Sequence, residues 1–186
     1  MLLGHMNAMQ ALMAQPQALE NRVLERLNAG RSVRSFLIAT VELLAEAVNI
    51  LVVQVFRKDD YAVKYAVEPL LLGDGPLGEL SVRLKLIYGL GMINRSEYED
   101  CELLMALREE LNYDGSEYRF TDDEILGPFG ELHCVSGLPP CPDFAGDDVD
   151  LRAMQQQRYQ QVVRSTMVLS RTTLISQISL KQAFKK

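Results

Sequence analysis

Apolar residues recur at helical spacing along most of the chain. Residues 18–30 read "ALENRVLERLNAG", with apolar positions at Leu19, Val23, Leu24 and Leu27 and a glycine placed to end the helix. The last stretch carries a similar stripe, formed by Tyr159, Val163, Met167, Leu174 and Ile178. No segment alternates apolar and polar residues for long enough to predict a strand. The pattern predicts an all-α, bundle-like protein with a long C-terminal helix.

The longest apolar run covers residues 35–56, and Ser32 or Ser35 is placed to open its helix. The run is long enough to span a bilayer. However, Glu42, Glu46 and Asn49 share one helical face, and each carboxylate near the centre of a membrane span would cost about 2.5–3.5 kcal/mol. The run is therefore interpreted as the central helix of a protein core with one polar stripe, and no membrane contact is expected.

Turn and cap signals divide the remainder of the chain. A further helix is expected to continue to Pro69, and "GDGPLG" then breaks the pattern. Two capping boxes are predicted, Ser96 with Glu99 and Thr121 with Glu124. These signals predict a flexible segment at 1–17 and a single helical domain over 18–186. Within that domain, 136–150 is expected to be a Pro/Gly loop and 151–186 a basic C-terminal helix.

Charge is distributed unevenly. Residues 1–96 hold 10 Lys/Arg and 9 Asp/Glu, residues 97–150 hold 2 and 16, and residues 151–186 hold 7 and none. The basic end is therefore expected mainly to neutralise carboxylates of the acidic middle, or else each part has its own partner. The three cysteines and the absence of a signal-peptide pattern predict free thiols in the cytoplasm.

Two stretches imitate nucleic-acid or nucleotide motifs. "GDGPLG" fits G-x-G-x-x-G, but Pro76 removes one N–H donor, Asp74 adds a negative charge, and helical flanks favour a plain turn. Residues 82–109 have the layout of a helix-turn-helix. The first turns of its second helix carry four acids, which oppose contact with phosphate, so an ordinary helical hairpin is favoured.

No enzyme, metal site or cofactor is predicted. "LREELNYDG" resembles the Arg-x-x-x-x-His element of the helical HEPN ribonucleases, but Tyr113 takes the place of the histidine after Arg108 and is a poor base at neutral pH. His133, Cys134, Cys141 and Asp143 lack the close ligand pairing typical of zinc sites. No serine lies in a G-x-S-x-G elbow.

Several long blocks together resemble the mannitol operon repressor family: "ENRVLERLNAG", "VFRKDDYAVKYAVEPLL", "DGPLGELSVRLKLIYGLG", "ALREELN", "FTDDEILGPFGELHC" and "QRYQQVVRSTMVLS". The resemblance covers about residues 18–186. It implies an all-helical cytoplasmic protein that lowers transcription of the genes for mannitol uptake and oxidation. It supplies no catalytic or metal-binding residue.

Two hypotheses follow for how such a repressor would act. In the first, it works through a protein partner, either another regulator or a component of the sugar phosphotransferase system, which docks on acidic residues. The candidate acids are Glu97, Glu99, Asp100, Glu102, Asp122 and Asp123. In the alternative, a homodimer binds operator DNA directly through the basic C-terminal helix. The candidate contacts to phosphate or a partner are Arg158, Arg164, Arg171, Lys181, Lys185 and Lys186. The sequence reveals no effector pocket.

Overall fold

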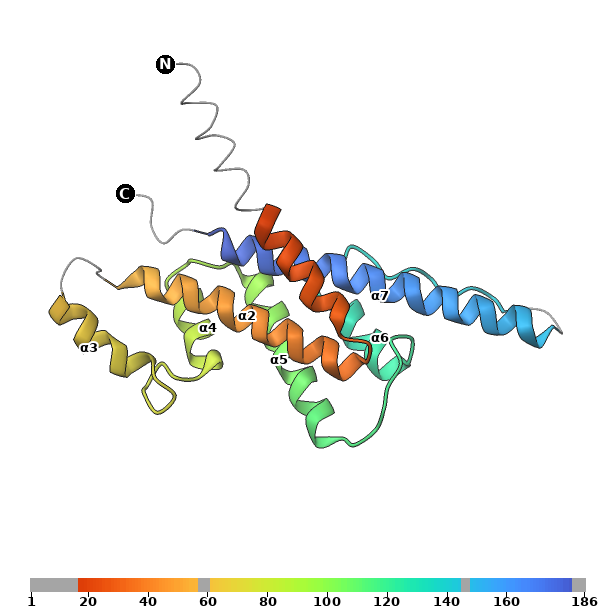
Figure 1. Ribbon diagram of the computed structural model, residues 1–186, viewed down its shortest axis with the longest axis horizontal. Helices are drawn as coiled ribbons and strands as arrows, with labels where there is room; N and C mark the ends of the chain where they lie inside the picture. Colours follow the sequence, from red (N-terminus) through yellow and green to blue (C-terminus); the bar gives the residue numbers. More distant parts are fainter. Residues whose placement is uncertain (1–16, 57–60, 145–147, 182–186) are drawn as a thin grey trace, which may run out of the picture.

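The computed structural model describes residues 17–56, 61–144 and 148–181, and every regular element in these ranges is a helix. A first helix covers residues 17–29. The others are α2 (Val33–Val55), α3 (Tyr61–Leu71), α4 (Leu80–Gly89), α5 (Arg95–Tyr113), α6 (Asp123–Gly130) and α7 (Val149–Ser179). The prediction of an all-α fold is confirmed. The molecule is elongated, with α3 at one end and the start of α7 at the other (Figure 1).

Helix α2 lies at the centre and contacts α4, α5 and α7. Ser32 opens it, because the Ser32 hydroxyl accepts a hydrogen bond from the Ser35 backbone N–H and the Ser35 side chain accepts from the Ser32 backbone N–H. Eleven of its residues are buried. By length and composition this helix also passes the test for a membrane span. Its burial among three other helices is the reason to treat it as a core helix.

The polar stripe of α2 is occupied by arginines from two neighbouring segments. Arg26, on the 17–29 helix, lies 3.0 Å from a Glu42 oxygen and 2.5 Å from a Glu46 oxygen. Arg83 of α4 donates to the Asn49 side-chain oxygen at 3.0 Å. The three polar residues Glu42, Glu46 and Asn49, which disfavour a membrane span, therefore bind the first helix and α4 to α2.

Helix α3 continues through Pro69 and ends at Leu71, so the prediction that it stops at the proline was wrong by two residues. The "GDGPLG" stretch is a tight turn. A Cβ atom at Gly75 would approach the Pro69 carbonyl oxygen to 2.3 Å, so only glycine fits at this position of the turn. Arg83 fastens the turn by donating to the Leu77 and Leu71 carbonyl oxygens, each at 2.5 Å.

The caps of α5 and α6 differ from the predicted ones. Helix α5 begins with Asn94, whose side chain and that of Glu97 accept reciprocal backbone hydrogen bonds, and not with Ser96 and Glu99. Helix α6 is preceded by Asp122, whose side chain makes no capping hydrogen bond within the helix, so the predicted box of Thr121 with Glu124 is also wrong. Helix α6 ends at Gly130 with Pro128 inside it.

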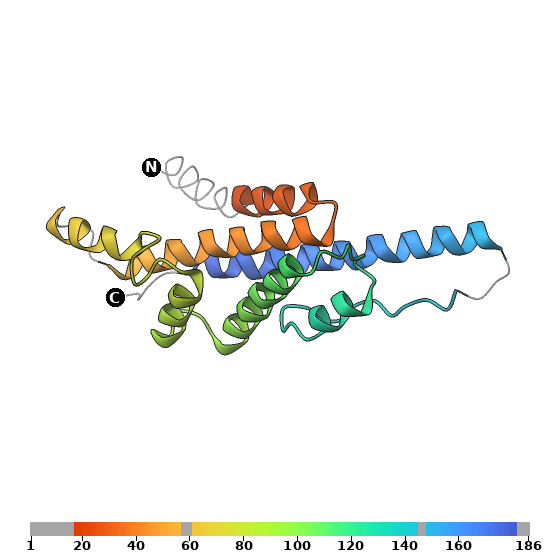
Figure 2. The same ribbon diagram turned by 90° about the horizontal axis from the view of Figure 1, so that it is seen from below.

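Helix α7 is 31 residues long and runs beside α2, while its first turns extend beyond the other helices (Figure 2). The predicted stripe is confirmed, since all five of its residues are buried. The helix begins at Val149 and ends at Ser179, so it does not reach residue 186 as predicted. The described part of the Pro/Gly loop has no regular structure. Residues 1–16 lie outside the described residues, so the predicted flexible segment and single domain stay predictions.

Candidate partner-binding surfaces

The predicted basic contacts of α7 have different surroundings. Arg158 is exposed on the extended part of the helix. Arg164 donates to the carbonyl oxygens of Asn28 at 2.9 Å and Gly30 at 2.7 Å, which ties α7 to the end of the first helix. Lys181 forms an ion pair with Glu97. Lys185 and Lys186 lie outside the described residues.

Arg171 is fully buried, so the prediction that it contacts phosphate or a partner was wrong. Its guanidinium lies 4.7 Å from the centre of the Phe129 ring. One terminal nitrogen donates to the Cys134 sulfur at 3.2 Å and to the Ser170 hydroxyl at 3.0 Å. Nε and the other terminal nitrogen have no hydrogen-bond partner in the structure. Burial lowers the pKa of Arg171, because removing a cation from water disfavours its charged form.

Asp100 is buried near Arg171 and acts as an anchor for the chain after α6. Its two carboxylate oxygens accept the backbone N–H groups of His133 at 2.7 Å and Cys134 at 2.8 Å. The Arg171 cation and the Asp100 anion attract each other across the cluster. Burial raises the pKa of the Cys134 thiol to about 11, so the sulfur beside Arg171 is a thiol at neutral pH.

The predicted acidic surface is also only partly exposed. Glu97 and Asp100 are buried and were wrongly assigned to an open docking surface. Asp122 accepts from the backbone N–H and the side chain of Arg119, at 2.8 Å and 3.2 Å. Exposed or half-exposed positions remain at Glu99, Glu102 and Asp123.

The exposed predicted acids of α5 have local partners. Glu99 lies 2.6 Å from the Arg95 guanidinium and 2.9 Å from the His133 ring. The Arg95 hydrogen bond lowers the pKa of the Glu99 carboxyl, so it stays ionised. Glu102 accepts from the Tyr98 hydroxyl, which raises the pKa of Tyr98 to about 12.

The expected pairing between the basic end and the acidic middle is therefore incomplete. It holds directly for Lys181 with Glu97 and at longer range for Arg171 with Asp100. Arg164 instead satisfies backbone carbonyls. The block 97–150 keeps exposed acids on α5 and α6, including Glu109 and Glu110, which sequence reasoning had not selected.

A groove of about 350 Å³ lies beside these acids, where α5 meets α2 and α4. Its apolar lining comes from Val41, Leu80 and Met105. Its polar lining comes from Arg108, Glu109 and Asn112 of α5. Tyr113 also lines it and is 85% exposed. An apolar centre with an exposed aromatic residue and a charged rim is the usual composition of a protein-binding surface.

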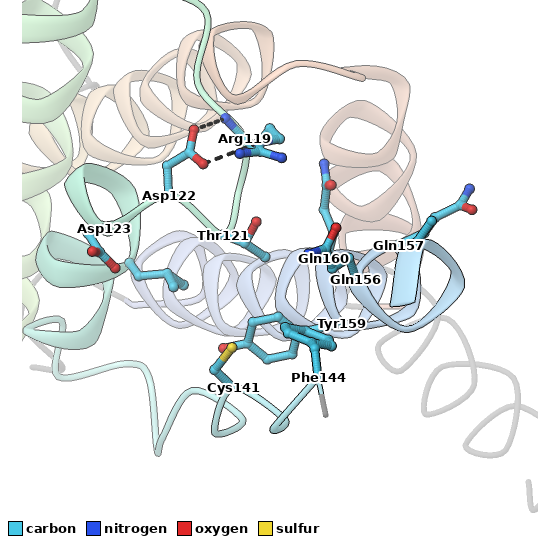
Figure 3. Close-up of a pocket in the computed structure, with 12 residues that line it drawn as sticks. Arg119, Thr121, Asp122, Asp123, Cys141, Phe144, Gln156, Gln157, Tyr159 and Gln160 are labelled. Carbon is cyan, nitrogen blue, oxygen red and sulfur yellow. Dashed lines mark hydrogen bonds and ion pairs between the residues drawn. The ribbon is translucent and has the colours of Figure 1, made fainter. Parts of the chain in front are cut away.

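A second hollow, of about 400 Å³, is formed by the start of α6, the Pro/Gly loop and α7 (Figure 3). Arg119 and Asp122 line one side of it, and Tyr159 and Phe144 contribute aromatic rings. Among the described residues, no group of three or more His, Cys, Asp and Glu side chains is placed to hold a metal ion. The prediction of no metal or cofactor stays a prediction.

Comparison with known proteins assigns the family. A family model described as "Mannitol repressor" matches residues 19–179. The chain is 78% identical over 183 residues to the mannitol operon repressor of Escherichia coli strain K12, covering 98% of this chain and 94% of that protein. It is also 26% identical over 163 residues to fumarase E of the same strain, covering 86% of this chain and 96% of that protein.

A solved structure agrees with this assignment. The X-ray structure of the MtlR–HPr complex from Escherichia coli contains a chain that is 81% identical, with a TM-score of 0.85, covering 88% of this chain and 99% of that one. The family prediction is confirmed by the sequence match and by the shared helical fold. This chain belongs to the mannitol repressor family.

Proposed function

We propose that this protein represses the mannitol operon in the cytoplasm by binding a protein partner, and that the partner is HPr. The observation that carries the proposal is the solved complex between HPr and a relative that is 81% identical to this chain. The predicted class of partner, a component of the sugar phosphotransferase system, fits that complex. The proposal includes no catalytic step, in line with the repressor family.

The exposed acids support a docking face on α5. Glu109 and Glu110 follow Glu102 by seven and eight residues, so the three acids lie on one side of the helix. The groove lined by Met105 and Tyr113 adjoins that side. Exposed acids around an apolar groove would attract a partner with basic residues near its binding surface and speed its association.

Direct contact with DNA is less well supported, because few of the predicted basic contacts are free to bind phosphate. A protein that binds duplex DNA neutralises several phosphates with Lys or Arg, and its affinity falls steeply with salt. Of the predicted contacts that lie within the described residues, only Arg158 is exposed and without an ion pair or hydrogen bond. A homodimer stays a prediction that sedimentation of the purified protein would test.

The test combines titration calorimetry with HPr and a gel shift with mannitol promoter DNA. The chain should bind HPr and should give no specific DNA shift at about 0.15 M salt, where phosphate contacts are already weakened. A specific shift at that salt without HPr would instead support direct operator binding. Absence of HPr binding together with such a shift would overturn the proposal.

The docking face is tested with paired charge reversals. Glu109→Lys with Glu110→Lys changes the proposed face, while Glu25→Lys with Glu68→Lys makes the same change of net charge at exposed positions elsewhere. The first pair should weaken HPr binding by about tenfold or more, and the second should change it about threefold or less. Equal effects of the two pairs would show that only net charge matters.

A further inference from the structure

The hollow between α6, the Pro/Gly loop and α7 is well placed to bind a small molecule. Its volume of about 400 Å³ lies within the range of about 300–1,000 Å³ that is usual for small-molecule sites. Figure 3 shows its lining side chains arriving from these three segments and from the connection just before α6, which carries Arg119 and Thr121. We call it the proline-loop cavity. Its lining includes Arg119, Asp123, Phe144, Gln156, Tyr159 and Gln160.

The aromatic part of the cavity is held in place. Tyr159 is 8% exposed, and its hydroxyl donates to the Pro139 carbonyl oxygen at 2.9 Å, which joins α7 to the loop. Phe144 and Leu126 are half-buried beside the hollow. These side chains provide an apolar surface against which the carbon skeleton of a ligand can lie.

The polar groups around that surface are uncommitted. The amides of Gln156, Gln157 and Gln160 line the cavity, and none has a hydrogen-bond partner among the described residues. The Thr121 hydroxyl and the Asp123 carboxylate also line the cavity and have no hydrogen-bond partner among the described residues. Each amide offers both donors and an acceptor, so together they match a ligand whose groups also donate and accept.

The charge of the lining selects against anions. Arg119 is the one cation of the lining, and it already forms an ion pair with Asp122 at 3.2 Å. The Asp123 carboxylate is left without a counter-charge and would repel a phosphate. It would accept hydrogen bonds from hydroxyl groups. Several free amides, one free carboxylate and an aromatic surface are suited to neutral hydroxyl-rich compounds.

We propose that the proline-loop cavity binds a neutral acyclic polyol of the hexitol class. The inference rests on the proposed function, because a repressor of the mannitol operon has a reason to sense a hexitol. A hexitol has a hydroxyl on every carbon, which matches the spread of amides along α7. A phosphorylated hexitol has the same skeleton but meets the unpaired Asp123 carboxylate. Occupation would connect α6, the loop and α7 through one ligand.

The test measures mannitol binding to the full chain by calorimetry and by the chemical shifts of side-chain amides. Mannitol should bind saturably, and mannitol 1-phosphate should bind at least about tenfold more weakly. The double variant Gln156→Ala with Gln160→Ala should weaken mannitol binding by about tenfold or more, since it removes several hydrogen bonds. A matched control is Gln155→Ala with Gln161→Ala, which removes two exposed amides of the same helix outside this cavity.

Three results would overturn the inference: no saturable response to mannitol, equal losses in the two double variants, or tighter binding of the phosphate. Circular dichroism of each variant shows whether α7 stays folded. HPr binding is measured separately on the same samples. A chain that binds HPr but no hexitol would overturn the cavity assignment and leave the repressor proposal intact.

Discussion

The buried arginine of α7 allows the architecture to be tested by stability. Replacing Arg171 with alanine would remove a side chain with no exposed surface, leave a void beside Phe129, and take away a cation that attracts the buried Asp100 carboxylate. Truncating a large, fully buried side chain to alanine costs about 3–5 kcal/mol, mainly through the void that it leaves. The lost attraction to Asp100 is the smaller part of this cost, because Asp100 keeps its two backbone donors. Arg171→Ala should therefore lower the free energy of unfolding by about 3–5 kcal/mol.

A methionine at the same position separates charge from packing. Arg171→Met fills most of the space and removes two guanidinium nitrogens that are buried without acceptors. It loses the contacts to Cys134 and Ser170, but the Asp100 carboxylate keeps its two backbone donors. The expected cost is about 1–2 kcal/mol, because removing unsatisfied buried donors offsets part of the loss.

The measurement is urea unfolding followed by circular dichroism at neutral pH, with Arg158→Ala as the control. Arg158 is exposed on the same helix, so its replacement should change stability by about 0.5 kcal/mol or less. The reasoning is refuted if Arg171→Ala costs no more than that control. It is also refuted if methionine costs as much as alanine, because the void beside Phe129 would then contribute nothing to the cost.

Three further predictions concern a helix cap, the reactivity of the thiols and the stability of the fold at low pH. Asn94→Ala removes the side chain that caps α5 and should cost about 1 kcal/mol in urea unfolding. Burial raises the pKa of the Cys101 thiol, so an alkylating reagent followed by mass spectrometry should label exposed Cys141 first and Cys101 only on unfolding. The Tyr118 hydrogen bond lowers the pKa of Asp114, so this carboxylate stabilises the fold above about pH 4 and loses that effect as pH falls further; Asp114→Asn should flatten the acid side of the stability profile.

The helices could be predicted from sequence because their apolar spacing agrees with their burial. The stripe of α7 and the central position of the long apolar helix follow from periodicity alone. The polar stripe of that helix was identified as well. Its partners could not be, because Arg26 and Arg83 belong to other segments that only the fold brings beside Glu42 and Asn49.

The cap of α5 shows where local signals become ambiguous. Asn94 with Glu97 and Ser96 with Glu99 are overlapping candidates two residues apart, and either satisfies the local pattern. The structure uses the first pair, and it also places Lys181 against Glu97 from the far end of the chain. A contact between residues so distant in sequence is outside the reach of a capping rule.

The burial of Arg171 did leave a signal in the sequence. The residue follows Met167 by four positions and precedes Leu174 and Ile175 by three and four, so it lies within the apolar face of the helix. The prediction that Arg171 is a surface cation relied on its charge and neglected the apolar residues on the same helical face. The proline-loop cavity had no comparable signal, because its glutamines meet Asp123 and Phe144 only through the path of the loop.

The positions of the basic residues in the C-terminal region affect how the repressor can act. Neutralising one phosphate contributes about 0.9 to the slope of log affinity against log salt, and duplex-binding proteins that depend on phosphate commonly make 6–10 such contacts. Arg164, Arg171 and Lys181 are committed to the protein's own carbonyls, core and carboxylates. Of the predicted contacts that lie within the described residues, Arg158 would add about one contact per chain and about two in a dimer. If these described contacts carry DNA binding, they should contribute about 2 or less to the slope, and that contribution should disappear when Arg158 is replaced by glutamine. A slope of 6 or more would show that phosphate contacts dominate, and action through a protein partner would then lose its electrostatic support.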